Sequence, residues 1–407
     1  MTPGLRDWLA LDALPGLGPA KLAPLVRRWR EGDDLHWPQG WLAALPASLA
    51  QPLRLWLEHP ARSPLTPAID AAIGWERADS LHHLLHPGHP AWPELLNQLP
   101  DPPTILWAKG DLAILSRPAM AIVGTRRPTR EGQDNAARFA RALVEKGFCI
   151  ASGMALGIDG AAQRAALQVG GATIGVLGCG VDVIYPPRHA SLYRELLAGQ
   201  GLLLSEHAPT TRAHPRFFPR RNRLITGLSL GVLVVEAAEK SGSLVSARLA
   251  LEQDREVFAI PGSIHNPQSA GCLRLIRQGE AALVRDVDDM LADLSTWQVA
   301  ALDPLSKPLD RSLTAMGAPL DDAANPPAST PSLLSPSPSS PSSPALAVSP
   351  VAPESPLLAA LSDAPTPVDL LVELTGQSVA ELQLGLLELE LDGWVAQTTG
   401  GWVRRGR

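Results

Sequence analysis

The sequence contains no apolar run long enough to span a bilayer, and its N-terminus, "MTPGLRDWLALD", lacks the pattern of a signal peptide. Cysteine is scarce, since Cys149, Cys179 and Cys272 are the only three and lie far apart. They form neither a metal-ligand pair nor a disulfide framework, which predicts buried, reduced thiols in a reducing compartment. We therefore expect a cytoplasmic protein without a membrane span.

Acidic residues are missing from one long stretch of an otherwise acidic chain. The formal net charge at pH 7 is −6, yet residues 208–235 contain no Asp or Glu. Within this stretch the segment "HPRFFPRRNR" (214–223) places four arginines beside two phenylalanines. The negative balance argues against non-specific polyanion binding over the whole surface but is compatible with a local basic cleft. We expect these arginines to form such a cleft, in preference to a solvated helix face paired with acids.

Motifs typical of cofactor and catalytic sites are absent as well. The turn "GTRRPT" (124–129) does not match the G-x-G-x-x-G pattern of dinucleotide-binding proteins. No nucleophile elbow and no pair of carboxylates at an evident site can be identified. Asp159, Asp182 and Glu236 stand near the ends of expected strands, where we expect them to orient arginines or cap helices, with ligand contact by one of them left open. The sequence therefore predicts no enzyme, no cofactor and no metal site.

The length of 407 residues exceeds one ordinary core, so two or three domains are expected. Residues 1–80 are predicted to form a helical domain. Eight of the eleven tryptophans lie within residues 1–107, and we expect them in the core. The segment "LPGLGPAKLAPLVRRW" (14–29) resembles a helix-hairpin-helix, whose turn can offer N–H groups to a phosphate. A plain helical hairpin, with glycines that serve tight packing, is the alternative that we slightly favour.

Residues 81–298 alternate between short apolar runs and helical patterns. Strands are expected at 119–124, 148–152, 172–178, 202–206, 231–237, 256–262 and 281–284, with helices between them, for example at 131–146, 158–169 and 243–253. Near-continuous apolar strands separated by helices are typical of a parallel sheet covered on both faces. The predicted fold class is therefore α/β, with a Rossmann-like, doubly wound, mostly parallel sheet. An N-terminal helical domain of SAM or helix-hairpin-helix type and a C-terminal winged helix flank it.

The C-terminal third divides into a linker and a small domain. Residues 326–356 contain ten prolines and ten serines, which predicts a disordered tether within a linker at 299–356. Residues 357–407 read as three helices and a hairpin, "WVAQTTGGWVR", which is typical of a winged helix. The third expected helix carries four acids and no base, namely Glu381, Glu388, Glu390 and Asp392. Because DNA reading needs positive charge near phosphates, we expect this domain to contact protein.

Residues suited to phosphate binding follow several of the expected strands, where doubly wound sheets bind their ligands. Glycines, small hydroxyl side chains and cations can hold anions at helix N-termini. The predicted site residues are Gly124, Thr125, Arg126, Ser152, Gly153, Arg216, Phe218, Arg220, Arg221, Asn222, Arg223, Lys240, Ser241, Gly242 and Ser243. Several phosphate-sized sites in a row favour a polyanion. Phe217 or Phe218 could stack an unpaired base, with core packing expected for at least one of the two rings.

Taken together, these stretches resemble the DprA (Smf) family of DNA-processing proteins of bacterial natural transformation. The matching segments cover about residues 95–290 and include "AIVGTRRPTREG", "SGMALGIDGAA", "IGVLGCGVDVIYPPRH" and "FPRRNRLITGLSLGVLVVEAAEKSGSLVSARLALEQDREVFAIPGSIHNP". The resemblance implies a homodimer that binds single-stranded DNA without strong sequence preference, protects incoming strands and loads the RecA recombinase. Single-strand-binding protein is a further candidate partner. By position, Phe218 would contact a base, whereas Gln163 and Leu273 depart from the family, which usually has His at the first position and His or Asn at the second.

Two other functions compete with a single-strand-binding mediator. One is a nucleotide phosphoribohydrolase of the lysine-decarboxylase-like (LOG) family, which has a related fold. Its catalytic acid would align with Ser246, where this chain has no carboxylate. The other is an architectural adaptor whose basic cleft receives an acidic protein. Dimerisation and RecA contact rest on the resemblance alone, and no sequence feature locates either surface.

Overall fold

The computed structural model describes residues 2–32 and 35–294, and from the C-terminal part residues 361, 371, 375, 382, 386, 389, 395–398 and 401–404. The chain divides into two compact units, residues 1–315 and 316–407. The linker expected at 299–356, including the tether at 326–356, lies outside the described residues.

The first unit begins with a group of short helices. They are α1 (Leu5–Ala13), α2 (Pro19–Arg30), α3 (Gln39–Ala44), α4 (Ala47–Glu58) and α5 (Thr66–Arg77), with the 3-10 turn η1 (Pro60–Arg62). Gly16 permits the turn between α1 and α2 because its φ is +85°. Trp8 and Trp41 are fully buried with ring centroids 5.8 Å apart, edge to face. The prediction that the tryptophans of this region belong to the core is confirmed for these two and for Trp37, Trp56, Trp92 and Trp107, all of which are buried.

A nine-stranded sheet follows, in the order β1-β2-β6-β5-β4-β3-β7-β8-β9. Its strands are β1 (His82–Leu85), β2 (Leu106–Gly110), β3 (Ala119–Val123), β4 (Cys149–Ser152), β5 (Thr173–Val176), β6 (Gly201–Ser205), β7 (Gly231–Val234), β8 (Glu256–Ala259) and β9 (Ala282–Leu283). Strands β3 to β9 pair in parallel, whereas β2 runs antiparallel to β1 and β6. All seven expected strands are present, which confirms the Rossmann-like, doubly wound sheet. The antiparallel pair β1–β2 is an addition that the sequence pattern does not predict.

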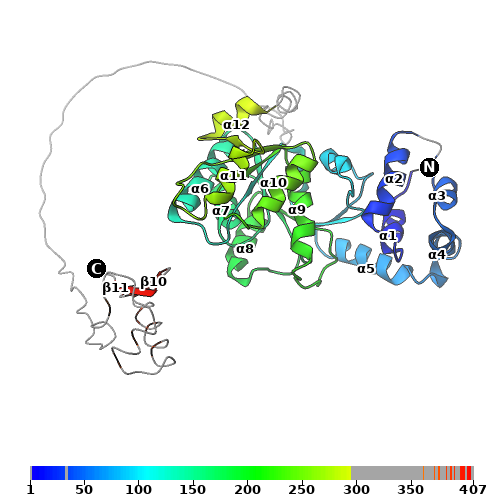
Figure 1. Ribbon diagram of the computed structural model, residues 1–407. Helices are drawn as coiled ribbons and strands as arrows, with labels where there is room; N and C mark the ends of the chain where they lie inside the picture. The colour runs from blue at the N-terminus through cyan, green and yellow to red at the C-terminus, as the bar shows by residue number, and fades with distance from the viewer. Residues whose placement is uncertain are drawn as a thin grey trace, which may run out of the picture. The chain divides into compact units, whose positions relative to one another are not determined.

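Helices cover both faces of this sheet (Figure 1). They are α6 (Arg130–Glu145), α7 (Ile158–Gln168), α8 (Ala190–Ala198), α9 (Phe217–Gly227), α10 (Ser243–Glu252), α11 (Ala270–Arg277) and α12 (Val287–Asp293), with 3-10 turns η2 (Glu94–Gln98), η3 (Leu112–Ser116) and η4 (Pro187–His189). On β3, Ala119, Ala121 and Val123 join the core under α9, α10 and α11. The intervening Met120 and Ile122 join the core under α6, α7 and α12. Successive side chains of a strand point to opposite faces of the sheet, so each central strand contributes to two separate cores. This explains why the central strands are apolar throughout.

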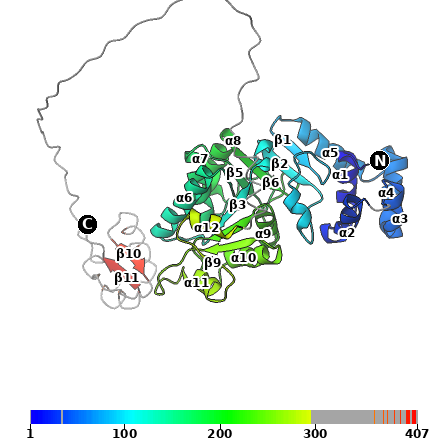
Figure 2. The same cartoon turned by 90° about the horizontal axis from the view of Figure 1, so that it is seen from above.

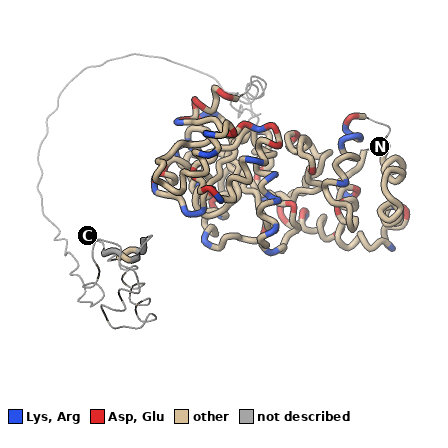
Figure 3. Tube along the Cα trace, in the orientation of Figure 1, with Lys and Arg blue, Asp and Glu red and all other residues tan. Residues whose placement is uncertain are grey.

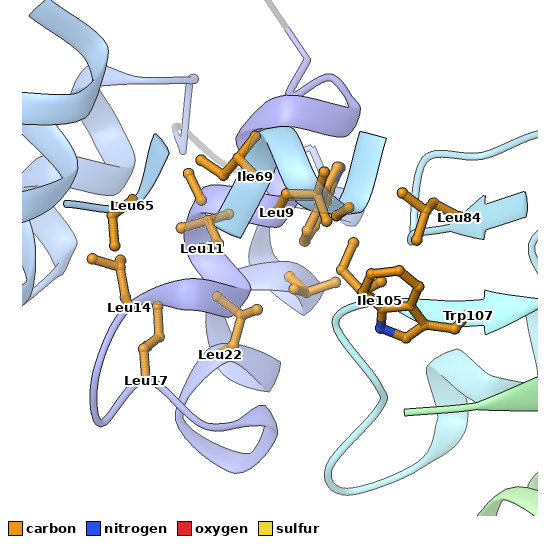
Figure 4. Close-up of a cluster of buried hydrophobic side chains, with 14 of the residues drawn as sticks. Leu9, Leu11, Leu14, Leu17, Leu22, Leu65, Ile69, Leu84, Ile105 and Trp107 are labelled. Carbon is orange, nitrogen blue, oxygen red and sulfur yellow. The ribbon is translucent and has the colours of Figure 1, made fainter. Parts of the chain in front are cut away.

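The N-terminal helices pack onto the antiparallel edge of the sheet. Viewed from above, α1 to α5 lie beyond β1 and β2, at one end of the unit (Figure 2). Leu11 of α1 and Ile69 of α5 belong to the same buried cluster as Leu84 of β1 and Trp107 of β2 (Figure 4). The unpredicted strands β1 and β2 therefore attach the helical part to the α/β part through a continuous apolar core.

The second unit shows the expected hairpin. Strands β10 (Val395–Thr398) and β11 (Gly401–Arg404) pair antiparallel. Leu382, Leu386 and Leu389 are helical and buried in one cluster with Val395 and Trp402. Their spacing of four and three residues places them on one helix face. The four acids expected on this helix lie outside the described residues.

The structure bears on two expectations from composition, which concern a membrane span and the state of the cysteines. Among the described helices, none combines the length and the apolarity that crossing a bilayer requires. Cys149, Cys179 and Cys272 are free and buried, which confirms the prediction of buried thiols.

The helical core predicts contrasting effects of one substitution at two positions of α4. Leu53 is fully buried, whereas Leu55 is 38% exposed on the same helix. Leu53→Ala should lower the free energy of unfolding by about 2–5 kcal/mol, because it removes buried methyl groups and leaves a cavity. Leu55→Ala makes the same chemical change in the same helix and should shift stability by only about 0.5 kcal/mol. Urea unfolding followed by circular dichroism compares them, and equal losses would contradict the assignment of this core.

Candidate functional site

The candidate site lies where the chain reverses its direction of winding across the sheet. The central strand β3 has β4 on one side and β7 on the other. A pocket of about 550 Å³ opens at the carboxyl ends of these strands, at the place where doubly wound sheets bind their ligands. Eight of the fifteen predicted site residues line it: Gly124, Arg126, Phe218, Arg221, Asn222, Ser241, Gly242 and Ser243. Two loops and the start of helix α9, far apart in sequence, therefore converge as expected.

The ring of Phe218 forms one wall of this pocket. Two guanidinium carbons approach its centroid, that of Arg126 at 5.9 Å and that of Arg221 at 6.0 Å. The ring of Tyr185 lies 5.3 Å away at an interplanar angle of 33°. Tyr185 also lines the pocket and is 39% exposed. It is a functional candidate that the sequence reading missed, although it lies in the quoted turn "GCGVDVIYP".

Phe217 has different surroundings from its neighbour. Its ring lies 4.1 Å from that of His207, and the Arg216 guanidinium lies 5.1 Å from its centroid. Neither Phe217 nor Arg216 lines the pocket. Phe218 therefore faces the pocket, in line with the position that the family resemblance gave it, whereas Phe217 packs elsewhere.

Arg221 lies beneath Phe218 as a buried cation. Its Nη1 donates hydrogen bonds to the backbone oxygens of Gly153, at 2.8 Å, and of Val176. Gly153 must be glycine here, because a Cβ would lie 2.6 Å from the guanidinium. Burial raises the pKa of the nearby Asp159 carboxyl, and the charge of Arg221 opposes that rise. Arg221 is thus held by the ends of β4 and β5 and forms part of the pocket floor.

Arg223 faces away from the pocket, on the other side of α9. Its guanidinium is only 6% exposed and pairs with Asp101, with Nε to Oδ2 at 3.2 Å, and with Glu206. Both acids lie outside the acid-free stretch 208–235 in sequence. The fold brings them next to Arg223. The expectation that these arginines are not paired with acids is therefore wrong for Arg223, which is an internal ion-pair partner. Arg221 lines the pocket as expected, although backbone oxygens bind its guanidinium.

Arg220 is exposed but lines a second pocket of about 270 Å³, together with Asp101 and Glu252. Its charge acts on the buried Glu206, whose pKa is raised by burial and lowered by Arg223 and Arg220. The arginines at the start of α9 therefore lie in two places, with Arg221 at the first pocket and with Arg220 and Arg223 at the second. Figure 3 shows basic and acidic positions interspersed over this unit.

The β3–α6 turn is closed by a carboxylate of the protein itself. Glu236, at the end of β7, accepts hydrogen bonds from the Thr129 N–H at 2.9 Å and from the Thr129 hydroxyl. Thr125 donates its N–H to the Glu236 backbone oxygen at 2.7 Å. The Thr125 N–H is therefore engaged by the protein itself, and the assignment of Thr125 to an anion stays a prediction.

The β4–α7 turn is closed in a similar way. Asp159 accepts hydrogen bonds from the N–H groups of Gly153, at 3.0 Å, and Ala155, at 3.4 Å. The buried Ser152 donates its hydroxyl to the Ile122 backbone oxygen at 2.6 Å. The polar groups of Ser152 and Gly153 are thus bonded within the protein, and their role as phosphate ligands stays a prediction.

The acids near strand ends are expected to orient arginines or to cap helices. Glu236 accepts hydrogen bonds from Thr129, which is the residue that caps α6, and Asp159 binds the β4–α7 turn beside Arg221. Asp182 accepts the Thr210 N–H at 2.8 Å. Of these three, Asp159 lines the pocket.

The β7–α10 turn presents Ser241, Gly242 and Ser243 to the pocket, and its own acids, Glu236 and Glu239, do not line that pocket. Ser241 and Ser243 share a hydrogen bond of 2.7 Å between their hydroxyls, and Gly242 between them is exposed. Lys240 is exposed at the start of this turn. None of the ion pairs within the described part of the chain involves Lys240 or Arg126. The N–H groups of Ser243, Leu244 and Val245 are bonded within the turn, so the start of α10 offers an anion the exposed Lys240 and the two serine hydroxyls.

Two further observations limit other chemistry at the pocket. Gln163, which departs from the family pattern, is buried and donates to the Ile174 backbone oxygen at 3.2 Å, away from the pocket. The described residues contain no group of three His, Cys, Asp or Glu side chains arranged to hold a metal ion.

Comparisons with known proteins agree with this architecture. The model of the DNA recombination-mediator protein A family matches residues 83–295, and that of the DprA winged helix domain matches residues 337–401, beginning within the expected linker. Protein Smf of Escherichia coli (strain K12) is 40% identical over 384 residues, which cover 92% of each chain. The DNA processing protein DprA of Bacillus subtilis (strain 168) is 43% identical over 217 residues, 53% of this chain and 71% of the relative. The X-ray structure of DprA from Streptococcus pneumoniae has a TM-score of 0.60 and 34% identity, covering 72% of this chain and 99% of that chain.

The ion pairs of Arg223 predict a structural role. Arg223→Ala should lower the free energy of unfolding by about 3–5 kcal/mol, because it leaves the buried Glu206 carboxylate uncompensated. Arg248→Ala is the matched control, since Arg248 is 74% exposed and its pair with Glu252 lies on the surface. The control substitution should lower the free energy of unfolding by at most about 1 kcal/mol. Chemical denaturation measures both, and a wild-type midpoint for Arg223→Ala would contradict the structural role.

Proposed function

The chain belongs to the DNA recombination-mediator protein A family, the DprA/Smf proteins, and from this membership we propose that it is a non-catalytic mediator that binds single-stranded DNA. In this proposal it protects incoming strands and loads the RecA recombinase during natural transformation. The DNA follows the strand-end pocket, with phosphates on the β7–α10 turn and an unpaired base against Phe218.

The observation that carries the proposal is the pairing of two features in one pocket. The serine hydroxyls at the start of α10, with the exposed Lys240 before them, suit a phosphate. The Phe218 ring, with Tyr185 beside it, suits the face of a base. Duplex bases are already stacked on each other and cannot offer that face. The combination therefore favours an unpaired strand.

The same pocket supports binding with little sequence preference. A ring stacks on any base, because every base has a π-face, and phosphates are common to all sequences. Arg126 is exposed on the other side of Phe218 and supplies a second cation along the strand. Arg216 and Arg220 lie outside the pocket and contribute at longer range.

The competing phosphoribohydrolase has little support from the pocket chemistry. Ser246 lies in the wall at the position expected of the catalytic acid and is buried. Among the described residues that line the pocket, Asp159 provides a carboxylate, but its oxygen is engaged by two backbone N–H groups. We therefore assign the pocket to binding.

The remaining partners follow from the family and not from the geometry. We propose a homodimer, with RecA and single-strand-binding protein as protein partners. The C-terminal winged helix domain is assigned to protein contact because of the acids expected on its third helix.

A salt titration of oligo-dT binding tests the proposal as a whole, with duplex DNA as competitor. Affinity should fall steeply with salt, since each phosphate contact releases counterions, and duplex DNA should compete poorly. Preference for a poly-acidic peptide would support the adaptor instead. Release of free base from nucleoside monophosphates would support the hydrolase.

Lys240→Ala should weaken binding to all oligonucleotide sequences equally, because Lys240 is assigned to a phosphate. It should also make the slope of log affinity against log salt shallower by about 0.7–1. Lys146→Ala is the matched control, since Lys146 lies at the far end of α6 and pairs with Asp288 at 2.9 Å. Fluorescence anisotropy at several salt concentrations separates the two, and identical slopes would remove Lys240 from the site.

Neighbouring phenylalanines provide a second test. Phe218→Ala should weaken single-stranded DNA binding by about 5- to 150-fold, the range that follows from losing one stacked base. Phe217→Ala removes the same ring one residue earlier on α9, outside the pocket, and should have a much smaller effect. Comparable losses of affinity in both variants would show that the two rings support the folded structure and that Phe218 does not stack on a base.

A further inference from the structure

We propose that Glu236 is a positioning residue for DNA binding, which holds the β3–α6 turn so that Arg126 faces the β7–α10 turn across the pocket. This inference rests on the proposed function, since Arg126 matters only if the pocket binds an anionic strand. Glu236 itself lines no pocket and is only 6% exposed.

Glu236 binds the far end of the β3–α6 turn through its carboxylate. One oxygen accepts the Thr129 N–H at 2.9 Å, and the other accepts the Thr129 hydroxyl. The same hydroxyl oxygen accepts the Gly132 N–H at 3.0 Å, which caps α6. The carboxylate of one loop therefore fixes where the helix of another loop begins.

Glu236 binds the near end of the same turn through its backbone. The Thr125 N–H donates to the Glu236 carbonyl oxygen at 2.7 Å. The turn from 125 to 129 is thus attached at both ends to a single residue. Arg126 and Arg127, between these attachments, are exposed. Their backbone is fixed while their side chains stay accessible.

Two glycines, Gly124 and Gly132, lie very close to Glu236 in the β3–α6 region. A Cβ on Gly132 would lie 2.4 Å from the Glu236 carboxylate, and a Cβ on Gly124 would lie 2.9 Å from its backbone oxygen. Any side chain at either position would push Glu236 away. Glycine at positions 124 and 132 therefore leaves the space in which Glu236 contacts the β3–α6 turn.

Glu236 also connects this turn to the other anion-binding loop. It lies two residues after the end of β7, in the segment that leads through Lys240 to the N-terminus of α10. A shift of Glu236 would change the separation of Arg126 from Lys240. Its buried negative charge at the start of α6 also disfavours a phosphate there and leaves the α10 N-terminus as the favoured place.

A double-mutant cycle tests this assignment in the full-length protein, with oligo-dT as the probe. Glu236→Ala should weaken binding by about 10-fold, the lower end of what loss of an orienting group costs at a binding site. Glu236→Gln should recover most of that affinity, because an amide oxygen still accepts the Thr129 N–H. In an Arg126→Ala background, Glu236→Ala should add less than about twofold, whereas in a Lys240→Ala background it should keep its effect.

Asp286→Ala is the matched control for a purely structural effect. Asp286 caps α12 by accepting the Asp289 N–H at 3.0 Å and lies outside the pocket. It should leave oligo-dT affinity unchanged. Should Glu236→Ala not fold, as judged by circular dichroism, the same cycle with Thr129→Ala decides the question from the other side of the hydrogen bond.

The failure of this inference differs from failure of the proposed function. Absence of oligo-dT binding by the wild-type protein would overturn the proposed function and the inference with it. Binding that is normal in the wild type, with additive effects of Glu236→Ala and Arg126→Ala, would overturn the inference alone. An unchanged affinity in a folded Glu236→Ala variant would do the same.

Discussion

The site depends on buried carboxylates that satisfy the protein's own turns and cations before any ligand arrives. Glu236 closes the β3–α6 turn, Asp159 closes the β4–α7 turn, and Glu206 neutralises Arg223. Each of these acids takes up an N–H group or a guanidinium that would otherwise attract an anion. What remains is the exposed Arg126 near Phe218, and the serine hydroxyls of the β7–α10 turn with the exposed Lys240 before them. A small, defined binding surface therefore arises by internal neutralisation of most of the available sites.

In the proposed function, this arrangement would let an acidic protein bind a single strand selectively. The formal charge of −6 opposes non-specific adsorption of nucleic acid over the surface. The accessible cations are few, so phosphate attraction alone would be weak and sensitive to salt. The aromatic wall of Phe218 and Tyr185 adds a contribution that an unpaired base can use and a stacked base cannot. Discrimination between single strands and duplex would then come from the rings and not from charge.

The rigid frame around the pocket follows from burial on both faces of the sheet. Residues of β3 enter two cores in alternation, which fixes the strand ends in relation to α6 and α10. The antiparallel pair β1–β2 extends this frame to the N-terminal helices through a cluster that includes Leu84 and Trp107. Rigid strand ends allow short loops to hold Arg126 and Lys240 at a set separation.

The sequence by itself determined the α/β class, the seven parallel strands, the tryptophan core and the loops that form the pocket, because apolar periodicity and glycine at strand ends are local signals. It could not determine which members of those loops face the pocket. Arg220, Arg221, Asn222 and Arg223 are neighbours in sequence, yet a helix turns each through about 100°, so they meet different surroundings. The acids that neutralise Arg223 come from residues 101 and 206, and the acid that closes the 125–129 turn comes from residue 236. Only the tertiary structure decided these pairings, because electrostatic and hydrogen-bond partners are set by distance in space, which sequence separation does not encode.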